Sequence, residues 1–461
     1  MRIKKKWMVG LVLTWLSGLA MGQAYDISIV VKGIADRQAI VGYHFGNQRL
    51  VLDTLAFDDR DRLRLTGNER LPNGVYFLYT PTFYFEFLVA EPVFSLETTV
   101  DGGYHALKVS GSEENARFKD FQLKMTEIQR GQRLLADSLR KLSGSDSIAL
   151  RGQILQLSEQ GIAYRDSLID ANEGTFFGRF VGLMRGITVP VYDEMEDGER
   201  RIAQYRYYKD HYFDLVPEPA ELMRTPVVHE YVMKYFNELV VPYPDSVIRE
   251  VDAWMAQVLD DKEAFRYWLV TLFNTYQESK IMGMDAVTVH MAERYYLSGL
   301  ADWVTEDAKK EIQKEVAFIK PNLLGNPAPA LNLLDTAMRP FPFQQLNQPY
   351  LVLYFYDPDC GVCKKKTPLL QEAYSEILAE GGEVVGICTI TDVNKWKSYI
   401  RERGLDWVNL GDPYGRSNFR AEYNVRSTPQ VYILDKNRKI IAKKIDVEQV
   451  VNFLRDHKSM K

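Results

Sequence analysis

Strands and helices alternate regularly over the last third of the chain, and this alternation limits the fold most strongly. The apolar run at residues 350–356 predicts a buried strand, a helix is expected from about residue 362 to 380, and a second strand follows at 383–389. Near the end, the runs PQVYIL and KIIAKKI are separated by a polar turn, which predicts an antiparallel hairpin. Strands that alternate with helices indicate a layered α/β fold.

Two of the three cysteines, Cys360 and Cys363, lie between the first of these strands and the helix after it. A CxxC pair in that position is a thioredoxin-like signature. Thiol-disulfide exchange needs an exposed cysteine with a lowered pKa, and a helix N-terminus favours the Cys360 thiolate. Cys363, one turn inside the helix, is placed to attack the mixed disulfide, and the spacing lets the two sulfurs form a disulfide. We therefore predict Cys360 as the nucleophile and Cys363 as the resolving thiol.

The chain begins with a basic segment, an apolar run from Trp7 to Met21 and small residues around Gly22, which is the layout of a secretory signal peptide. An uncleaved membrane anchor is the alternative, but the run is shorter than the ~20 residues that a spanning helix needs. We predict a signal peptide at residues 1–22, cleaved after Gly22 or Ala24, and a periplasmic or secreted mature protein. No cysteine lies near this site, so a lipoprotein is not expected.

Cysteine content and charge narrow the function further. Three cysteines in 461 residues are too few for a disulfide-stapled extracellular scaffold, so a CxxC pair in an exported chain indicates redox chemistry. A formal charge of −5 without a basic stripe argues against nucleic-acid binding. The six histidines form no ligand-spaced cluster, and neither a metal nor a cofactor is expected. The third cysteine, Cys388, lies in an apolar strand and is expected to be a buried, inert thiol.

Two further domains are predicted ahead of the α/β domain. Residues 25–111 alternate polar and apolar side chains in short runs broken by Gly, Asn and Asp, which predicts an all-β, sandwich-like domain. Residues 112–321 carry apolar side chains at helical spacing, which predicts an all-α domain. The protein is therefore expected to be multidomain, with the α/β domain at residues 324–461.

The C-terminal segment resembles the thioredoxin-fold domain of TlpA-like thiol-disulfide oxidoreductases of the bacterial envelope. The resemblance rests on the lead-in GNPAPALNLLD, the strand LVLYFY, the CGVC pair, Pro368, and Thr428-Pro429 before the strand QVYIL. It implies a thioredoxin-like fold and a cis peptide bond at Pro429 that faces the Cys360–Cys363 disulfide. The backbone around Thr428 would then pair with an extended substrate segment. The layout also resembles exported bacterial proteins whose leading β and helical domains have no established function.

Four residues near the CxxC pair are predicted to tune the pKa of its thiols: Tyr354, Asp357, Asp359 and Lys366. Tyr354 stands where typical thioredoxins have a buried acid that helps to move protons. Asp359 replaces the usual tryptophan before the first cysteine, and Lys366 replaces a glutamate that is frequent in TlpA-like members. Lys366 favours the thiolate while Asp357 and Asp359 oppose it, and the net pKa shift of Cys360 is expected to be downward.

The residues alone leave other uses of the pair open. A metal clip would need two more ligands, a peroxidase of the peroxiredoxin type would want Thr or Ser where Asp357 stands, and a structural disulfide closing two residues would restrain little chain entropy. About two thirds of the chain has no catalytic signature, so an envelope binding or scaffold protein with an auxiliary dithiol is the main competitor. We favour an exported thiol-disulfide oxidoreductase that reduces or isomerises disulfides in envelope proteins and receives electrons from a membrane donor.

Overall fold

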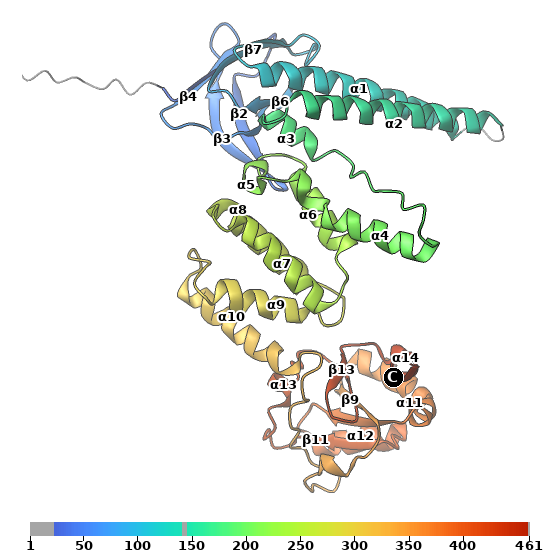
Figure 1. Cartoon of the computed structure of the whole chain (residues 1–461). Coiled ribbons are helices and arrows are strands. Elements are labelled where there is room, and N and C mark those ends of the chain that lie inside the picture. Colours follow the sequence, from blue (N-terminus) through green and yellow to red (C-terminus); the bar gives the residue numbers. More distant parts are fainter. Residues whose placement is uncertain (1–22, 141–144, 460–461) are drawn as a thin grey trace, which may run out of the picture. The chain divides into compact units, whose positions relative to one another are not determined.

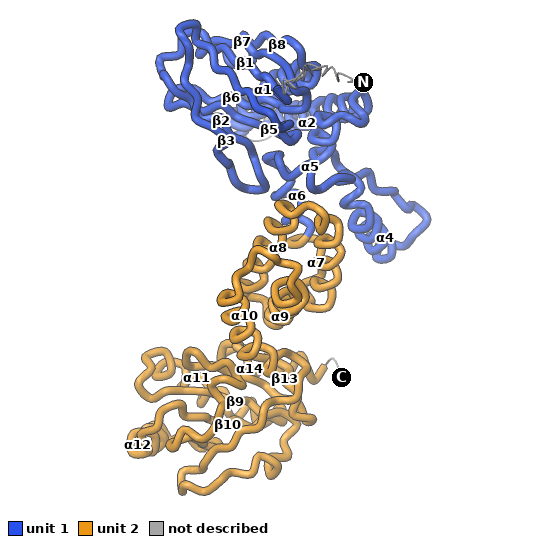
Figure 2. Tube along the Cα trace, turned by 90° about the vertical axis from the view of Figure 1, so that its left-hand side faces the viewer, with its two compact units in different colours: residues 1–235 blue, residues 236–461 orange. Residues whose placement is uncertain are grey.

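The computed structural model describes residues 23–140 and 145–459 of the chain. The predicted signal peptide, residues 1–22, lies outside the described residues. The chain divides into two compact units, Met1–Tyr235 and Phe236–Lys461, which Figure 2 shows in different colours. Because this division falls within residues 112–321, the segment predicted as one helical domain contributes helices to both units.

An all-β domain opens the first unit, as the alternating pattern predicts (Figure 1). Its strands pair as two four-stranded sheets, in the orders β4-β1-β7-β8 and β3-β2-β5-β6. Alternate side chains of β1, such as Ile27 and Ile29, are buried, and one hydrophobic core draws side chains from both sheets. The strands are β1 (Tyr25–Lys32), β2 (Gln38–Phe45), β3 (Gln48–Ala56), β4 (Arg62–Gly67), β5 (Gly74–Tyr79), β6 (Tyr84–Val89), β7 (Val93–Thr99) and β8 (Lys108–Ser110).

Two long helices follow the β domain and lie side by side as a hairpin (Figure 1). Ser112 begins the first of them, because its hydroxyl oxygen accepts a hydrogen bond from the Asn115 N–H at 3.0 Å. The two helices are joined by the Gln132 amide, which donates to the Ser158 hydroxyl at 2.9 Å. The helices of this unit are α1 (Glu113–Leu139), α2 (Ser145–Ala171), α3 (Phe176–Gly182), α4 (Asp197–Asp210), the 3-10 turn η1 (Tyr212–Leu215), α5 (Pro219–Leu222) and α6 (Val228–Lys234).

More helices begin the second unit, after the π-helical turn η2 (Tyr235–Leu239) at the division. Trp254 and Trp268 are fully buried in their core and pack edge to face, with ring centroids 5.4 Å apart. In residues 23–140 and 145–459, no helix combines the length and the apolar character of a membrane span. The helices are α7 (Pro244–Val258), α8 (Lys262–Gln277), α9 (Asp285–Met291), the π turn η3 (Ala292–Tyr296), α10 (Glu306–Ile319) and the 3-10 turn η4 (Lys320–Asn322).

A five-stranded sheet with helices on its faces completes the second unit and confirms the predicted α/β fold. The strand order is β11-β10-β9-β12-β13, with β9 to β11 parallel and the final β12–β13 pair an antiparallel hairpin, as expected. The strands are β9 (Tyr350–Tyr356), β10 (Gly382–Cys388), β11 (Val408–Gly411), β12 (Gln430–Leu434) and β13 (Ile440–Lys443). The helices are η5 (Phe343–Gln345), α11 (Gly361–Ala379), α12 (Val393–Arg403), α13 (Phe419–Glu422), η6 (Val447–Gln449) and α14 (Val450–Ser459).

The central strand β9 is buried along its whole length, which explains its unbroken apolar sequence. Its even-numbered side chains, such as Tyr354, pack in one core with residues of α11, α12 and α14. Its odd-numbered side chains, such as Phe355, pack in a second core with Phe419 of α13 and with the chain that leads into β9. Both faces of the sheet are therefore covered, and β9 points at the start of α11.

Candidate active site

Cys360 and Cys363 lie at the start of α11, directly after the buried strand β9. Cys360 is the N-cap residue, and its sulfur accepts a hydrogen bond from the Cys363 N–H at 3.4 Å. Cys360 is partly exposed, whereas Cys363 is fully buried against the sheet. The structure holds both as free thiols, so it represents the reduced pair.

The surroundings of the two sulfurs shift their pKa values in opposite directions. Burial raises the pKa of Cys360, but hydrogen bonds from the Cys363 N–H, the Thr428 side chain and the Val362 N–H outweigh it, and the net pKa is lowered from 9.0. Burial dominates at Cys363 and raises its pKa to about 11. The pair therefore offers one accessible thiol that ionises more readily than an ordinary cysteine and one protected thiol that ionises less readily.

The loop before β12 forms the opposite wall of the site. The Thr428-Pro429 peptide bond is cis, and the Cys360 thiol lies 3.2 Å from the Thr428 carbonyl oxygen, to which it donates. The structure thus brings Thr428, predicted from the sequence to bind substrate, into contact with the predicted nucleophile. A polar cavity of about 220 Å³ lies beside Pro429, with Arg426 and Lys444 among its lining residues.

The two aspartates before Cys360 have different surroundings. The Asp357 carboxylate accepts from the Asp359 N–H at 2.7 Å and fixes the turn, while the Asp357 N–H points at the Cys363 sulfur at 3.5 Å. The Asp359 carboxylate instead forms an ion pair with Lys395 of α12 at 2.6 Å. Lys395, which lies far from the CxxC segment in sequence, therefore partly balances the negative charge of Asp359 next to Cys360.

Lys366 is turned toward the 3-10 turn η6 rather than being free. Its ammonium group lies 2.7 Å from carboxylate oxygens of both Asp446 and Glu448. These two carboxylates raise the pKa of Lys366 and offset its charge. The positive charge of Lys366 is therefore neutralised within a local ion-pair cluster and acts only weakly on the cysteines.

Tyr354 is fully buried beneath the site and belongs to a cluster of hydroxyl groups. Its hydroxyl lies 2.9 Å from the Thr367 hydroxyl, which also accepts from Tyr399 at 3.0 Å. Thr367 follows Cys363 by one helical turn, so both side chains lie on the same face of α11. The position of the usual buried acid is thus filled by neutral hydroxyls. Sequence reasoning missed Thr367 and Tyr399, although the four-residue spacing from Cys363 could have indicated Thr367.

Cys388 ends β10 and is 1% exposed in the same core as Cys363. Burial raises the pKa of its thiol to about 12. Among the residues that the structure describes, no three His, Cys, Asp or Glu side chains are grouped so that they could hold a metal ion.

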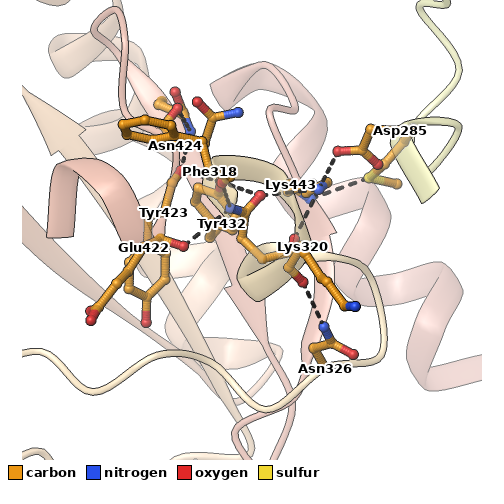
Figure 3. Close-up of polar contacts among 12 residues, drawn as sticks. Asp285, Phe318, Lys320, Asn326, Glu422, Tyr423, Asn424, Tyr432 and Lys443 are labelled. Atoms are coloured by element: carbon orange, nitrogen blue, oxygen red, sulfur yellow. Dashed lines mark hydrogen bonds and ion pairs between the residues drawn. The ribbon is translucent and has the colours of Figure 1, made fainter. Parts of the chain in front are cut away.

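A buried network of polar contacts includes Asp285, Tyr432 and Lys443 of the second unit (Figure 3). Lys443 of β13, only 3% exposed, forms an ion pair with Asp285 of α9 and donates to the Asn322 backbone carbonyl at 2.8 Å. The Asn322 side chain accepts from Lys443 at 3.2 Å. The Tyr432 hydroxyl donates to the Tyr423 carbonyl oxygen and lies 3.5 Å from the Asn322 side-chain oxygen. The Tyr432 hydroxyl accepts in turn from Gln430, the residue after the cis proline, at 3.1 Å. Asp285 and Asn322, which precede the α/β domain in the chain, therefore contact the residues that hold the cis-proline loop.

This chain is similar in sequence or structure to several known proteins. The sequence profile of the AhpC/TSA family matches residues 324–443. A domain described as a possible thiol-disulfide isomerase from Cytophaga hutchinsonii is 32% identical, over 30% of this chain and 95% of that domain, with a TM-score of 0.29.

Two other solved structures share lower identity. A thioredoxin-like protein from Bacteroides caccae is 19% identical, over 59% of this chain and 99% of that one, with a TM-score of 0.46. The thioredoxin domain of a thiol-disulfide oxidoreductase from Bacteroides vulgatus is 22% identical, over 29% of this chain and 96% of that one, with a TM-score of 0.28. The family match falls on the domain that carries the cysteine pair. Residues 324–443 therefore belong to a thioredoxin-like domain of the AhpC/TSA family.

Proposed function

We propose that this protein is an exported, TlpA-like oxidoreductase that reduces or isomerises disulfides of envelope proteins through Cys360 and Cys363. One observation carries the proposal: the partly exposed Cys360 caps α11 and accepts from the Cys363 N–H, which lowers its pKa, while Cys363 is fully buried, which raises its pKa to about 11. A nucleophile must be ionised and accessible, and a resolving thiol must stay protected until the substrate is bound. The two cysteines differ in the way that this division of labour requires.

In the proposed reduction, the Cys360 thiolate attacks one sulfur of a substrate disulfide. The S–S bond of the substrate breaks, a bond between Cys360 and that sulfur forms, and the leaving sulfur departs as a thiolate that takes up a proton. Cys363 then loses its proton and attacks Cys360, which releases the second substrate sulfur. Two electrons pass to the substrate, and Cys360 and Cys363 become a disulfide. In isomerisation, a thiol of the substrate attacks the mixed disulfide instead, and no net electrons are transferred.

Substrate binding is proposed at the loop that carries Thr428 and Pro429. The Thr428 carbonyl oxygen lies beside the Cys360 sulfur, so an extended segment that pairs with this backbone would hold its own cysteine at the attacking sulfur. The polar cavity beside Pro429, lined in part by Arg426 and Lys444, leaves room for polar substrate side chains.

Export and the electron source follow from the same proposal. An apolar segment at residues 7–21 after a basic start supports secretion, and reduction in an oxidising compartment requires that Cys360 and Cys363 be reduced again after each turnover. A membrane protein that passes two electrons to this pair would meet that requirement.

The test is a turbidity assay of insulin reduction by the purified mature chain, with dithiothreitol as the electron donor. Activity is expected in the wild type and in Cys388→Ser, and no activity is expected in Cys360→Ser. In the absence of dithiothreitol, reduced Cys363→Ser should accumulate a mixed disulfide with the substrate, visible by mass spectrometry as an added substrate mass. A wild type that is inert toward insulin but captures an envelope protein would contradict the enzyme and favour a scaffold, and consumption of hydrogen peroxide instead would indicate a peroxidase.

A further inference from the structure

Helix α2 carries large apolar side chains on two of its faces. One face packs on α1, where the Leu157 side chain lies beside Gly131 and Gln132 donates to the Ser158 hydroxyl. On another face Ile148, Leu155 and Ile162 are 71%, 60% and 48% exposed. A surface helix of a monomer normally carries polar side chains on the face that it does not bury. The second apolar face of α2 is therefore a candidate surface for contact with another protein chain.

These three side chains form one narrow line, here called the α2 stripe (Ile148, Leu155 and Ile162). Each is seven residues from the next, which is two helical turns, so all three point the same way. A seven-residue apolar repeat is the spacing with which helices pair in coiled coils. The stripe extends over about 21 Å of helix at 1.5 Å per residue, which is room for two heptads.

The sequence around the stripe is symmetric about Leu155. Ile148 lies seven residues before it and Ile162 seven residues after it; Arg151 lies four residues before it and Glu159 four residues after it. Both charged side chains are exposed and lie close to the line of the stripe. The apolar residues are thus mirrored in position, while the charges are mirrored with opposite sign.

This symmetry favours a second copy of α2 as the binding partner, with the two helices antiparallel. A second copy of α2 running antiparallel, with a two-fold axis at Leu155, sets the two Leu155 side chains against each other and Ile148 level with Ile162 of the second copy. Arg151 then lies level with Glu159 of the second copy at both ends of the contact. A parallel pair would instead align arginine with arginine and glutamate with glutamate, which is unfavourable.

We propose that the chain forms a homodimer through the α2 stripe, with the two α2 helices antiparallel. The interface is isologous, because the same patch of each copy meets itself across a two-fold axis. Six buried aliphatic side chains and two flanking charge pairs make a small interface, so the dimer is expected to form reversibly in the micromolar range. The proposal does not depend on the redox activity of the second unit.

Sedimentation velocity of the purified chain, in the presence of a phosphine reductant that prevents disulfide-linked dimers, gives the first test. The wild type is expected to change from monomer to dimer as its concentration rises through the micromolar range. Leu155→Glu places two carboxylates on the axis and is expected to weaken association about 100-fold or more. Leu134→Glu is the matched control, because Leu134 lies on α1 of the same hairpin, is 61% exposed and stands outside the stripe; it should associate like the wild type.

Charge reversal tests the antiparallel direction. Arg151→Glu and Glu159→Arg are each expected to weaken association about fivefold, because each places like charges at both ends of the contact. The double variant R151E/E159R restores opposite charges and is expected to return to within about twofold of the wild type. Unchanged circular dichroism and melting temperature show that each variant is folded.

Three outcomes would overturn the proposal. A wild type that stays monomeric up to about 0.1 mM has no such dimer, whether the stripe is bare or is covered by another part of the same chain. A dimer that survives Leu155→Glu uses another surface. Failure of the double charge reversal to restore association rules out the antiparallel register.

Discussion

The ammonium group of Lys395 lies 2.6 Å from the carboxylate of Asp359, the residue directly before Cys360. Asp359 lies at the N-terminus of α11, where its negative charge destabilises the Cys360 thiolate. Lys395 comes from α12 and brings an opposite charge to the same place. The local cost of an aspartate at this position is therefore reduced by a residue from another helix.

Replacing Lys395 by methionine should raise the pKa of Cys360 and slow its reaction with a model disulfide. The Asp359 carboxylate then repels the thiolate without compensation, and the expected loss in rate at pH 7 is about two- to fivefold. Stopped-flow measurement of the reaction with 5,5'-dithiobis(2-nitrobenzoic acid) gives the rate. Because both side chains are largely exposed, the loss should disappear in about 1 M salt.

Two variants control this prediction. Lys397→Met removes a lysine from the same helix and should leave the rate unchanged. Asp359→Asn in the Lys395→Met background should restore the rate, since no carboxylate is left to repel the thiolate. Equal slowing by both lysine variants would show that net charge, and not the Asp359 pair, controls Cys360.

The two active-site thiols should ionise in separate pH ranges. The pKa of Cys360 is lowered from 9.0, so its thiolate and its reaction with iodoacetamide should appear below pH 9 as pH rises. Burial raises the pKa of Cys363 to about 11, so Cys363 should react only when the pH approaches that value. Tandem mass spectrometry of the reduced, folded protein locates the label on each cysteine. Labelling of Cys363 before Cys360 would reverse the roles proposed for the pair.

Thr367→Val should destabilise the reduced protein by about 1–3 kcal/mol. The Tyr354 and Tyr399 hydroxyls both bond to the Thr367 oxygen, and valine leaves them buried without that partner. Thr367→Ser keeps the oxygen and removes one methyl group, so a smaller loss of about 1 kcal/mol is expected. Urea denaturation followed by tryptophan fluorescence compares the two. A serine variant less stable than the valine variant would assign the role of Thr367 to its methyl group.

Lys443→Met should lower the stability of the second unit by about 3 kcal/mol. The substitution leaves Asp285 and the Asn322 carbonyl without the buried ammonium group, and removal of one partner from such a pair is costly. Adding Asp285→Leu should recover part of the loss, because a buried pair can be replaced by apolar groups. The control is Lys444→Met, which changes the adjacent exposed lysine and should have little effect. A Lys443→Met protein as stable as the control would show that the pair contributes nothing to stability.

Local pattern was sufficient to predict the fold of the α/β domain. The apolar run at 350–356, the CxxC pair and the final hairpin each depend on neighbours in sequence, and the structure has all three in the expected elements. The all-β domain could also be predicted from the sequence, because alternation with a period of two residues indicates which side chains of β1 face the core. The division at residue 235 was not predicted, since helical periodicity is the same on both sides of it.

The electrostatic partners of the site could not be read from the sequence. Asp359 and Lys395 are 36 residues apart, Thr367 and Tyr399 are 32 apart, and Lys366 lies 80 residues from Asp446. Only the packing of α12 and α14 on α11 brings these groups within hydrogen-bonding distance. The sequence identified which residues near the cysteines are unusual, and the fold determines what each of them contacts.

The hydrogen bond from the Cys360 thiol to the Thr428 carbonyl has a consequence for the order of events at the site. A thiol has a proton to give to that oxygen, and a thiolate has none. Ionisation of Cys360 therefore vacates the carbonyl at the same moment that it creates the nucleophile. Under the proposed mode of substrate binding, the loss of this one proton would both create the nucleophile and free a lone pair of the carbonyl oxygen for a substrate backbone N–H.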